Sequence, residues 1–461
     1  MADRPETGAD SKALRAVGGM AVITVVGLAL SFALHNPTRR QFPQRQQVRF
    51  WHMWRGEWAD VVQRIVDRFN DSQDTYEVIA LSVPGHAANS KFLLAVAGGD
   101  PPDCMAQWNN VIPKWADSKL LVALNDPKNG LMTSDQWERF KKTTYPIAKK
   151  IGMYKGNLYG VTTGLNIWAC YYREDFLEEA GLDPARFPKT LEGLVEWGRT
   201  LHRFDAEGRL KRIGFMPQWF RTYAPGFGGG LWDWANPAGI MLDTPQNLRA
   251  LSWLVACREE LGFENVKRLE EGFRQGFAGD WPFIRGYYAI HVDGQWRVEQ
   301  LAKYAPDVPY GTIPIPPPAE GGRKHFGWSN GNFMIVPAGA DCPKGAWEFI
   351  RFWSGLADPE RAAEFYTWGG WLPLNHAVAD AKVYRKYVDD HPQFQTFIDL
   401  LPSENIHPMP PVPYQDYLAD RIQQMDDSAM RGSLTPRQAM DKLVREIAIE
   451  RTRRRETRRG D

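Results

Sequence analysis

An alternation of strand and helix patterns between residues 48 and 110 limits the possible folds more than any other feature of the chain. The predicted strands are Val48 to Trp51, Tyr76 to Val83 and a segment that contains Cys104 and Met105. The helical patterns between them contain Trp58, Val62, Ile65 and Phe69, and then Phe92 to Val96. Such an alternation predicts an α/β fold with a parallel sheet, whose loops at the carboxyl ends of the strands line one crevice.

The same theme returns further along the chain. We expect helices that contain Leu194 to Leu201 and Leu248 to Val255, and strands at Ile213 to Met216 and Tyr288 to Val292. Because 461 residues exceed what one hydrophobic core usually supports, the chain is expected to form two domains. A last helix is predicted to begin at Thr435-Pro436, since Thr is a good N-cap and Pro suits the first turn.

The N-terminal segment indicates export. Residues 1–15 form a predicted cytoplasmic region, and Ala16 to Leu34 is an uncharged run of about 19 residues, long enough to cross a bilayer. This length favours an uncleaved membrane anchor, with a cleaved signal peptide as the alternative. Residues 35–47 then serve as a linker. The expected location is periplasmic or extracytoplasmic, tethered to the inner membrane by residues 16–34.

Charge and ligand spacing exclude several classes of protein. The formal net charge is +1, and no basic run in the body has interleaved aromatic residues, so nucleic acid is not an expected partner. The basic tail, residues 450–461, is interpreted as a solvated end, with attraction to anionic lipid as the alternative. The four cysteines form no C-x-x-C and the nine histidines no H-x-x-x-H, so neither a metal site nor a cofactor is predicted.

The 19 tryptophans favour a binding cleft. Several stand in stretches rich in Gly, Asn or Pro, with Asn or Asp close by, rather than on periodic apolar faces. An indole offers an apolar face to the C–H groups of a sugar ring, and the neighbouring polar groups can pair with its hydroxyls. This combination occurs at Trp108-Asn109-Asn110, Asp293-Gly294-Gln295-Trp296 and Trp328-Ser329-Asn330. Several such places suit an oligosaccharide better than a single ring.

The order of these segments resembles the family 1 extracellular solute-binding proteins of bacterial ABC importers, the maltose-binding-protein type, over residues 48–449. The stretches that carry the resemblance are Val48-Arg49-Phe50-Trp51, Gly99-Asp100-Pro101-Pro102-Asp103, Asn157-Leu158-Tyr159-Gly160-Val161, Tyr171-Tyr172-Arg173-Glu174-Asp175-Phe176, Thr190 to Arg203, Tyr288 to Trp296, Tyr310-Gly311-Thr312-Ile313-Pro314 and Ala346-Trp347-Glu348-Phe349-Ile350. The chain departs from the family in having no cysteine placed for lipidation after the apolar run.

The resemblance implies a two-lobed periplasmic-binding-protein-like fold, with two parallel-sheet lobes joined by a hinge that closes on the ligand. It assigns residues 48–164 and 312–358 to lobe 1, and residues 165–311 and 359–449 to lobe 2. The implied partners are a small-molecule carbohydrate and the permease subunits of an ABC transporter, with the receptor itself a monomer. A role for an anchored receptor in sensing stays open beside import.

The resemblance and the tryptophan pattern together give the expected ligand-binding residues. Asn166 occupies the first crossover between the lobes, where the maltose type has a ligand-binding acid, and Trp296 matches the stacking aromatic of the second lobe. The predicted set is Trp54, Arg55, Glu57, Trp108, Asn110, Asn166, Trp168, Asp293, Trp296, Trp328, Asn330 and Trp371.

An exported serine hydrolase is the alternative. Gly327-Trp328-Ser329-Asn330-Gly331 has the G-x-S-x-G pattern, and a glycine-rich stretch precedes it at residues 227–230. Candidate partners follow in the required order at Asp389, Asp390, His391 and His407. However, a nucleophile elbow needs a strand before the serine and a helix after it, whereas here a polar turn precedes and a strand is predicted to follow. A glycosidase with carboxylates distant in sequence also stays open.

Overall fold

The computed structural model describes residues 40–460 except for 84, 237–238 and 274–277. Its main element is an eight-stranded mixed sheet in which β10, β6, β11, β3, β1 and β2 follow one another, while β9 pairs with β6 and β12 pairs with β11. The strands are β1 Gln46–His52, β2 Tyr76–Ser82, β3 Cys104–Trp108, β6 Gly160–Arg173, β9 Ile290–Gly294, β10 Tyr310–Ile313, β11 Gly327–Ile335 and β12 Ile406–His407. Two small two-stranded sheets pair β4 Met153–Tyr154 with β5 Asn157–Leu158 and β7 Arg203–Phe204 with β8 Leu210–Arg212.

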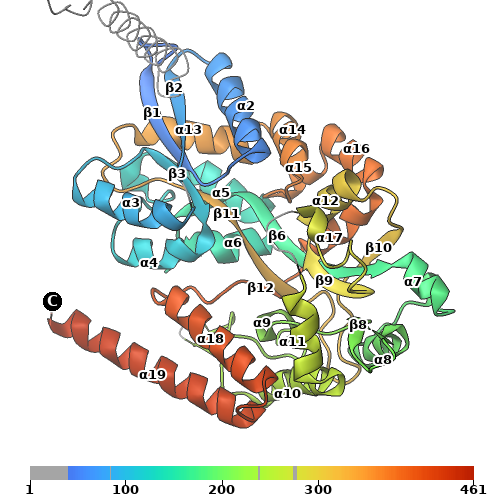
Figure 1. Cartoon of the computed structure of the whole chain (residues 1–461). Coiled ribbons are helices and arrows are strands. Elements are labelled where there is room, and N and C mark those ends of the chain that lie inside the picture. Colours follow the sequence, from blue (N-terminus) through green and yellow to red (C-terminus); the bar gives the residue numbers. More distant parts are fainter. Residues whose placement is uncertain (1–39, 84, 237–238, 274–277, 461) are drawn as a thin grey trace, which may run out of the picture.

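The helices cover both faces of this sheet (Figure 1). The first half of the chain contains α2 Glu57–Asp71, α3 Gly85–Ala97, α4 Ile112–Asp117, α5 Ser134–Thr143, α6 Pro146–Gly152, α7 Glu174–Glu179, α8 Leu191–Leu201 and α9 Phe220–Tyr223. The second half contains α10 Pro245–Leu261, α11 Phe263–Glu271, α12 Trp296–Tyr304, α13 Pro343–Ser354, α14 Pro359–Gly369, α15 His376–Ala379, α16 Lys382–Asp390, α17 Gln395–Leu400, α18 Gln415–Met430 and α19 Pro436–Gly460. Five short 3₁₀ segments, among them η1 Asn109–Val111 and η4 Ala278–Asp280, complete the elements.

The predicted alternation at the beginning of the chain is confirmed. Strands β2, β1 and β3 are parallel neighbours, and α2 and α3 connect them. Helix α2 buries Val62, Ile65 and Phe69 as its periodicity predicted. Trp58 in its first turn is 41% exposed instead, because it lines a pocket described below.

The prediction of a parallel sheet in the second half of the chain is wrong. Strands β9 and β10 both pair with β6 in the antiparallel sense. The expected strand at Ile213 to Met216 forms only one parallel bridge, between Ile213 and Tyr288. The sheet is mixed because β1, β2 and β3 pair in parallel, whereas β6 pairs antiparallel with β9, β10 and β11.

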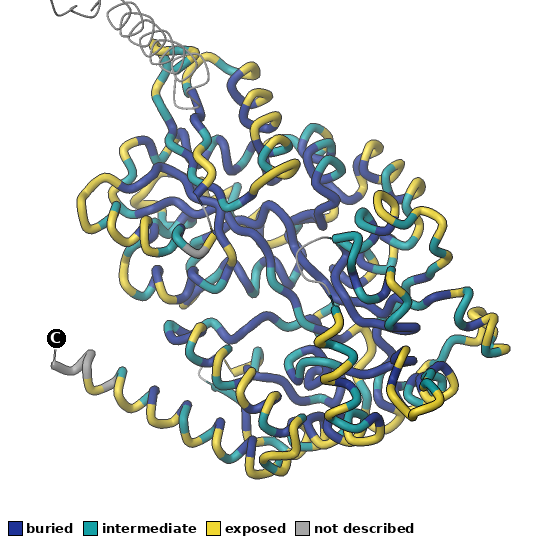
Figure 2. The backbone as a smooth tube through the Cα atoms, viewed as in Figure 1, coloured by how far each residue is buried: buried dark blue, intermediate teal, exposed yellow. Residues whose placement is uncertain are grey.

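Strand β6 separates two hydrophobic cores. Along it, Leu165, Ile167, Ala169 and Tyr171 belong to one core, whereas Trp168 and Cys170 belong to the other. This division follows from the two-residue period of a strand, which sends alternate side chains to opposite faces. Most residues of this strand and of β11 are buried, and Figure 2 shows buried backbone through the centre of the molecule.

Segments far apart in sequence share a layer at each end of the molecule. Helix α13 packs on β1, and α14 packs on both α13 and α2 (Figure 1). At the opposite end, α18 packs on α19 and on α10. The predicted lobe boundaries stay a prediction, and the structure adds that α14, which they assign to lobe 2, contacts helices assigned to lobe 1.

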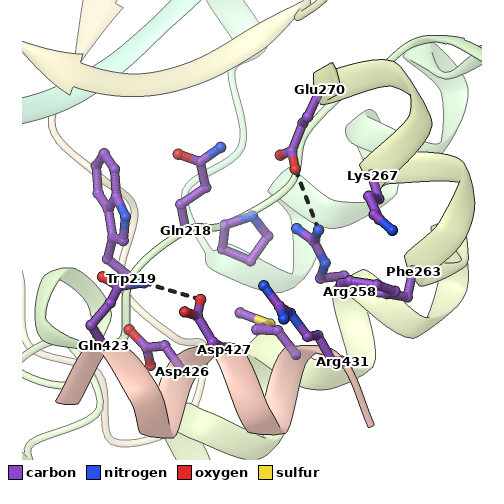
Figure 3. A pocket seen from close by; sticks show the side chains of 12 residues that line it. Gln218, Trp219, Arg258, Phe263, Lys267, Glu270, Gln423, Asp426, Asp427 and Arg431 are labelled. Carbon is purple, nitrogen blue, oxygen red and sulfur yellow. Dashed lines mark hydrogen bonds and ion pairs between the residues drawn. The ribbon is translucent and has the colours of Figure 1, made fainter. Parts of the chain in front are cut away.

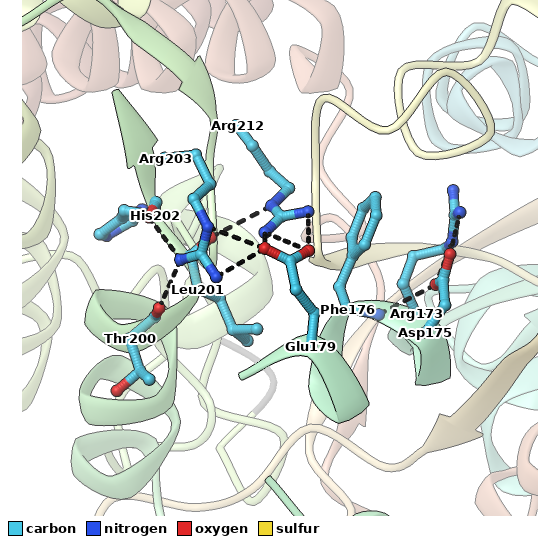
Figure 4. Close-up of polar contacts among 9 residues, drawn as sticks. All are labelled: Arg173, Asp175, Phe176, Glu179, Thr200, Leu201, His202, Arg203 and Arg212. Carbon is cyan, nitrogen blue, oxygen red and sulfur yellow. Dashed lines mark hydrogen bonds and ion pairs between the residues drawn. The ribbon is translucent and has the colours of Figure 1, made fainter. Parts of the chain in front are cut away.

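A cluster of charges holds α7 against the small β7–β8 sheet (Figure 4). The Glu179 carboxylate accepts hydrogen bonds from Arg203 and Arg212, at distances of 2.8 to 3.1 Å. These bonds, with that from Arg212 the strongest cause, lower the pKa of Glu179. The guanidinium of Arg212 also lies 3.9 Å from the centre of the Phe176 ring. The Glu179 contacts thus join α7, which follows β6 in the chain, to the β7–β8 sheet.

The C-terminal tail continues helix α19 instead of fraying. Thr435 caps this helix as predicted, since its hydroxyl accepts from the Gln438 amide N–H at 3.3 Å. Near its end, buried Glu450 accepts hydrogen bonds from Arg453 and Arg454. Within residues 40–460, as far as they are described, no helix is both long and apolar enough to cross a membrane. The predicted anchor, Ala16 to Leu34, and the cytoplasmic region before it lie outside the described residues.

The crossing of β6 and β11 makes a testable demand on Gly331. A Cβ at this position would meet the Gly164 carbonyl oxygen at 2.6 Å, and a backbone atom cannot move aside cheaply. We expect Gly331→Ala to lower the free energy of unfolding by about 2 kcal/mol, the cost of overpacking a core. Urea denaturation checks this, with Ser329→Ala in the same strand as the control. Equal midpoints for the two variants would contradict the close-packing argument.

Candidate functional site

A network of amides lies at the end of the β6–β11 pairing, around Asn166 and Asn330. We call this place the strand crossing. Asn166 donates from Nδ2 to the Asn330 Oδ1 atom at 2.8 Å, and its own Oδ1 accepts from Gln295 Nε2 at 3.0 Å. Gln295, which is 1% exposed, also accepts from the Ile167 amide at 3.2 Å. The structure therefore brings two predicted residues together, and adds Gln295, which the sequence interpretation quoted but did not select.

Three predicted tryptophans gather beside this network. The rings of Trp168 and Trp328 are 4.4 Å apart, and Trp168 meets Trp296 edge to face at 5.3 Å. Trp296 and Trp328 are half-buried, whereas Trp168 is 5% exposed. The buried indole thus supports two others that keep exposed surface. The arrangement places aromatic faces next to amide donors and acceptors, as a polyhydroxylated ligand requires.

Trp296 also lines a pocket of about 450 Å³ between α2 and α12, which we call the α2–α12 pocket. Two further predicted residues, Arg55 and Glu57, lie on its wall. Its remaining lining residues are Trp58, Val61, Ala278, Glu299, Gln300, Lys303, Tyr304, Trp368 and Gly369. Glu57 is bound by Lys303 at 2.6 Å, so this carboxylate and ammonium neutralise one another across the pocket.

Trp54 and Trp371 lie elsewhere than expected for ligand contacts. Each is 4% exposed, and both stack around Trp353 at ring separations of 5.7 and 5.8 Å. In this structure neither indole has an exposed face for a sugar. Their contact with the ligand stays a prediction, and the packing shows a second role, as a rigid aromatic layer in the core.

The other predicted residues, Trp108, Asn110 and Asp293, lie outside the tryptophan group and outside the lining of the α2–α12 pocket. Trp108 is 42% exposed at the end of β3, and Asn110 donates from Nδ2 to Asp416 Oδ1 on α18 at 2.9 Å. Asp293 is 6% exposed and is bound by Arg297 at 2.8 Å. Its second oxygen accepts from the Gly294 amide, so Asp293 orients the start of α12 rather than facing the α2–α12 pocket.

Ser329 does not have the surroundings of a nucleophile. It lies inside β11 with 0% exposure, and its hydroxyl contacts the Asn330 carbonyl at 3.3 Å. The sharp strand-to-helix turn that exposes a hydrolase serine is therefore replaced by a continuous strand. In the described ranges, no three His, Cys, Asp or Glu side chains are grouped as metal ligands.

A second pocket, of about 400 Å³, contains none of the predicted residues (Figure 3). We call it the α11–α18 pocket, and it is lined by Pro217, Gln218, Trp219, Arg258, Phe263, Lys267, Glu270, Gln423, Asp426, Asp427, Met430 and Arg431. Three distant stretches of chain supply these residues, 217–219, 258–270 and 423–431. Trp219 follows Gln218 and has no Asn or Asp beside it in the sequence, so the pattern used for the other sites did not select it.

Comparison with known proteins decides the family. A family model described as "bacterial extracellular solute-binding protein" matches residues 64–396, more than two thirds of the chain. The chain belongs to this family. The resemblance drawn from the sequence is confirmed, and the family binds solutes rather than transforming them. The Ser329 hydrolase hypothesis is accordingly not supported.

The curated relatives and solved structures are similar along nearly their whole length. The sn-glycerol-3-phosphate-binding periplasmic protein UgpB of Salmonella typhimurium is 23% identical over 452 residues, which covers 91% of this chain and 95% of that protein. The structure of CpMnBP1 with mannotriose bound is 25% identical with a TM-score of 0.72, covering 87% of this chain and 99% of that one. MalE of Xanthomonas citri is 20% identical with a TM-score of 0.72, covering 90% and 100%. The chain therefore has the two-lobed fold of these binding proteins.

Asp426, on the wall of the α11–α18 pocket, makes the free energy of unfolding depend on pH. Burial raises the pKa of Asp426 to about 7, against a hydrogen bond from the Phe220 amide and the positive charge of Arg221. A carboxyl whose pKa is raised in the folded state stabilises the fold fully only below its ordinary pKa. That contribution is lost as the pH rises through about 7.

We expect Asp426→Asn to remove this pH dependence. Between about pH 5 and about pH 8, wild type should lose roughly 2 kcal/mol of unfolding free energy relative to the variant. Denaturant titrations of both proteins at several pH values measure the difference. Both proteins contain the same buried histidines, so the contribution of these histidines cancels in the comparison. Parallel curves for the two proteins would contradict the prediction.

Proposed function

We propose that this protein is an extracytoplasmic receptor that binds a carbohydrate between its lobes and presents it to the permease of an ABC importer. The observation that carries the proposal is the group of Trp168, Trp296 and Trp328 next to the Asn166–Asn330–Gln295 amide network. The proposed ligand-binding set is the predicted one, with Gln295 added.

The chemistry of this group suits a neutral sugar. The C–H face of a pyranose packs well on an indole, and its hydroxyl rim needs both donors and acceptors. An amide side chain supplies one of each, and a network of amides supplies them without a net charge. In the α2–α12 pocket the ion pair of Glu57 and Lys303 leaves little net charge for binding an anion.

The relatives support the class of solute and also supply the competing one. CpMnBP1 was solved with mannotriose, and another similar structure, TM-score 0.71, is a cyclic α-maltosyl-1,6-maltose binding protein from Arthrobacter globiformis. UgpB is named for sn-glycerol-3-phosphate. A glycerol phosphate is therefore included in the binding screen below, where its selective binding would replace the sugar proposal.

The remaining features of the proposal concern location and assembly. The receptor is proposed to act as a monomer, without metal or cofactor, and without catalysis. Residues 16–34 are proposed to tether it to the inner membrane, with a cleaved signal peptide as the alternative. Family membership and the periplasmic relatives support an extracytoplasmic location.

The test is thermal unfolding of the protein against a panel of mono- and oligosaccharides and glycerol phosphates. A ligand at about 100 times its Kd should add about 2.7 kcal/mol to the free energy of unfolding. Stabilisation by one class of sugar, with the sugar recovered intact, supports the proposal. Stabilisation by glycerol phosphate alone, or recovery of cleaved sugar, would overturn it.

Trp296 gives the sharper mutational test. Truncation of a stacking anchor to alanine should weaken sugar binding by at least about 1 kcal/mol, since the exposed indole face is lost. Calorimetric titration measures this. Trp197→Ala is the matched control, because Trp197 packs on Phe187 at 5.2 Å on helix α8, away from the crossing. Wild-type affinity in Trp296→Ala would remove this residue from the site.

A further inference from the structure

The α11–α18 pocket contains two buried polar atoms that have no hydrogen-bond partner in the described part of the chain. One is the Asp426 Oδ1 atom on α18, an acceptor, and the other is the Arg258 Nε atom on α10, a donor. Asp426 is 4% exposed, and its other oxygen accepts from the Phe220 amide at 3.1 Å. Because buried polar groups are normally paired, this pocket is built to receive groups that both accept and donate.

The other contacts of Arg258 are loose. Its guanidinium meets Glu270 at 3.4 Å and the Met216 sulfur at 3.7 Å, both at the limit of hydrogen bonding. Glu270 in turn lies 3.5 Å from the Tyr288 hydroxyl. Figure 3 shows Arg258 and Glu270 along one wall, with Gln423 bound to Asp427 on the other. Ligand hydroxyls can therefore compete for these groups without breaking a strong ion pair.

Trp219 is held on the wall of this pocket in a strained backbone conformation. Its φ angle is 59°, a left-handed value that is uncommon for a bulky residue. The next amide, that of Phe220, is fixed by Asp426, so the carboxylate that lines the pocket also anchors the strained turn. Strain of this kind is retained where the surrounding structure positions a side chain for use.

Arg221 connects this pocket to the tryptophans at the strand crossing. Its guanidinium lies 5.6 Å from the Trp219 ring and 4.3 Å from the Trp328 ring. Trp328 in turn contacts Trp168, which contacts Trp296 on the wall of the α2–α12 pocket. A chain of aromatic and guanidinium contacts thus joins the two pockets. Indoles pack on sugar rings, and a guanidinium donates hydrogen bonds to sugar hydroxyls.

We propose that the α11–α18 pocket is a second carbohydrate subsite, so that the solute is an oligosaccharide with units at both the strand crossing and this pocket. The inference rests on the proposed function. Sugar hydroxyls both donate and accept hydrogen bonds, so different hydroxyls of one sugar unit can satisfy Asp426 Oδ1 and Arg258 Nε. Lining groups of both signs, with an indole and two amides, match a neutral polyol better than an anion or a cation.

The experiment compares affinity across a series of chain lengths. Calorimetric titration uses the mono- to tetrasaccharides of the sugar class that stabilises wild type, with Arg258→Met and Asp427→Asn as pocket variants. Arg258→Met keeps the aliphatic packing, and exposed Asp427 tolerates an isosteric change, so both should fold. Arg199→Met is the matched control, because Arg199 on α8 pairs with Glu260 outside the pocket.

Wild type should bind the longest sugar most tightly. Each pocket variant should lose about tenfold in affinity for that sugar and less than about twofold for the monosaccharide, whereas the control should change neither. Affinity that does not rise with chain length, or losses that are equal at every length, would overturn the second subsite and leave the receptor proposal intact. Binding of no sugar at all would instead refute the proposed function itself.

Discussion

The antiparallel pairing of β6 with β11 is the contact on which the rest of the structure depends. Seven pairs, from Ser329 opposite Ile167 to Ile335 opposite Gly160, join the two strands, with one irregularity after Asn332. Gly331 lets the backbones approach closely, since a Cβ at this position would strike the Gly164 carbonyl oxygen. Residues of both strands belong to the buried core, and the ladder sets the relative positions of Asn166 and Asn330 in the candidate site.

Strand parity then selects the side chains at the crossing. Asn166 and Trp168 on β6 and Trp328 and Asn330 on β11 are each two residues apart, so each pair projects from one face. The residues between them, Ser329 and Ile167, are buried. The same alternation that excludes Ser329 from solvent thus leaves its two neighbours, Trp328 and Asn330, partly exposed.

Local patterns in the sequence were sufficient for part of this structure. The helix of Val62, Ile65 and Phe69 and the cap at Thr435 depend on neighbours a few residues away, and both formed as predicted. Burial depends on distant packing. Trp54 and Trp371 have sequence neighbours like those of the exposed tryptophans. Both are nevertheless covered by Trp353, on helix α13, which is far from Trp54 in the sequence.

The α11–α18 pocket could not be predicted for a related reason. Its floor combines Arg258 and Asp426, which are far apart in sequence and come together only when α18 packs on α10. No spacing rule connects such residues, and a carboxylate on an amphipathic helix is ordinarily taken as solvated. The unpaired oxygen of Asp426 and the strained turn at Trp219 mark the pocket, and both are properties of the folded chain.

Two exposed polar contacts bridge the candidate site, in addition to the part-buried contact of Asn166 with Asn330. Glu57 with Lys303, and Asn110 with Asp416, join segments that the predicted division assigns to different lobes. Exposed ion pairs and polar contacts of this kind contribute about 0 to 1 kcal/mol each. They orient the lobes without locking them. In the proposed receptor, the solute can favour closure only by as much as its affinity differs between the open and the closed state.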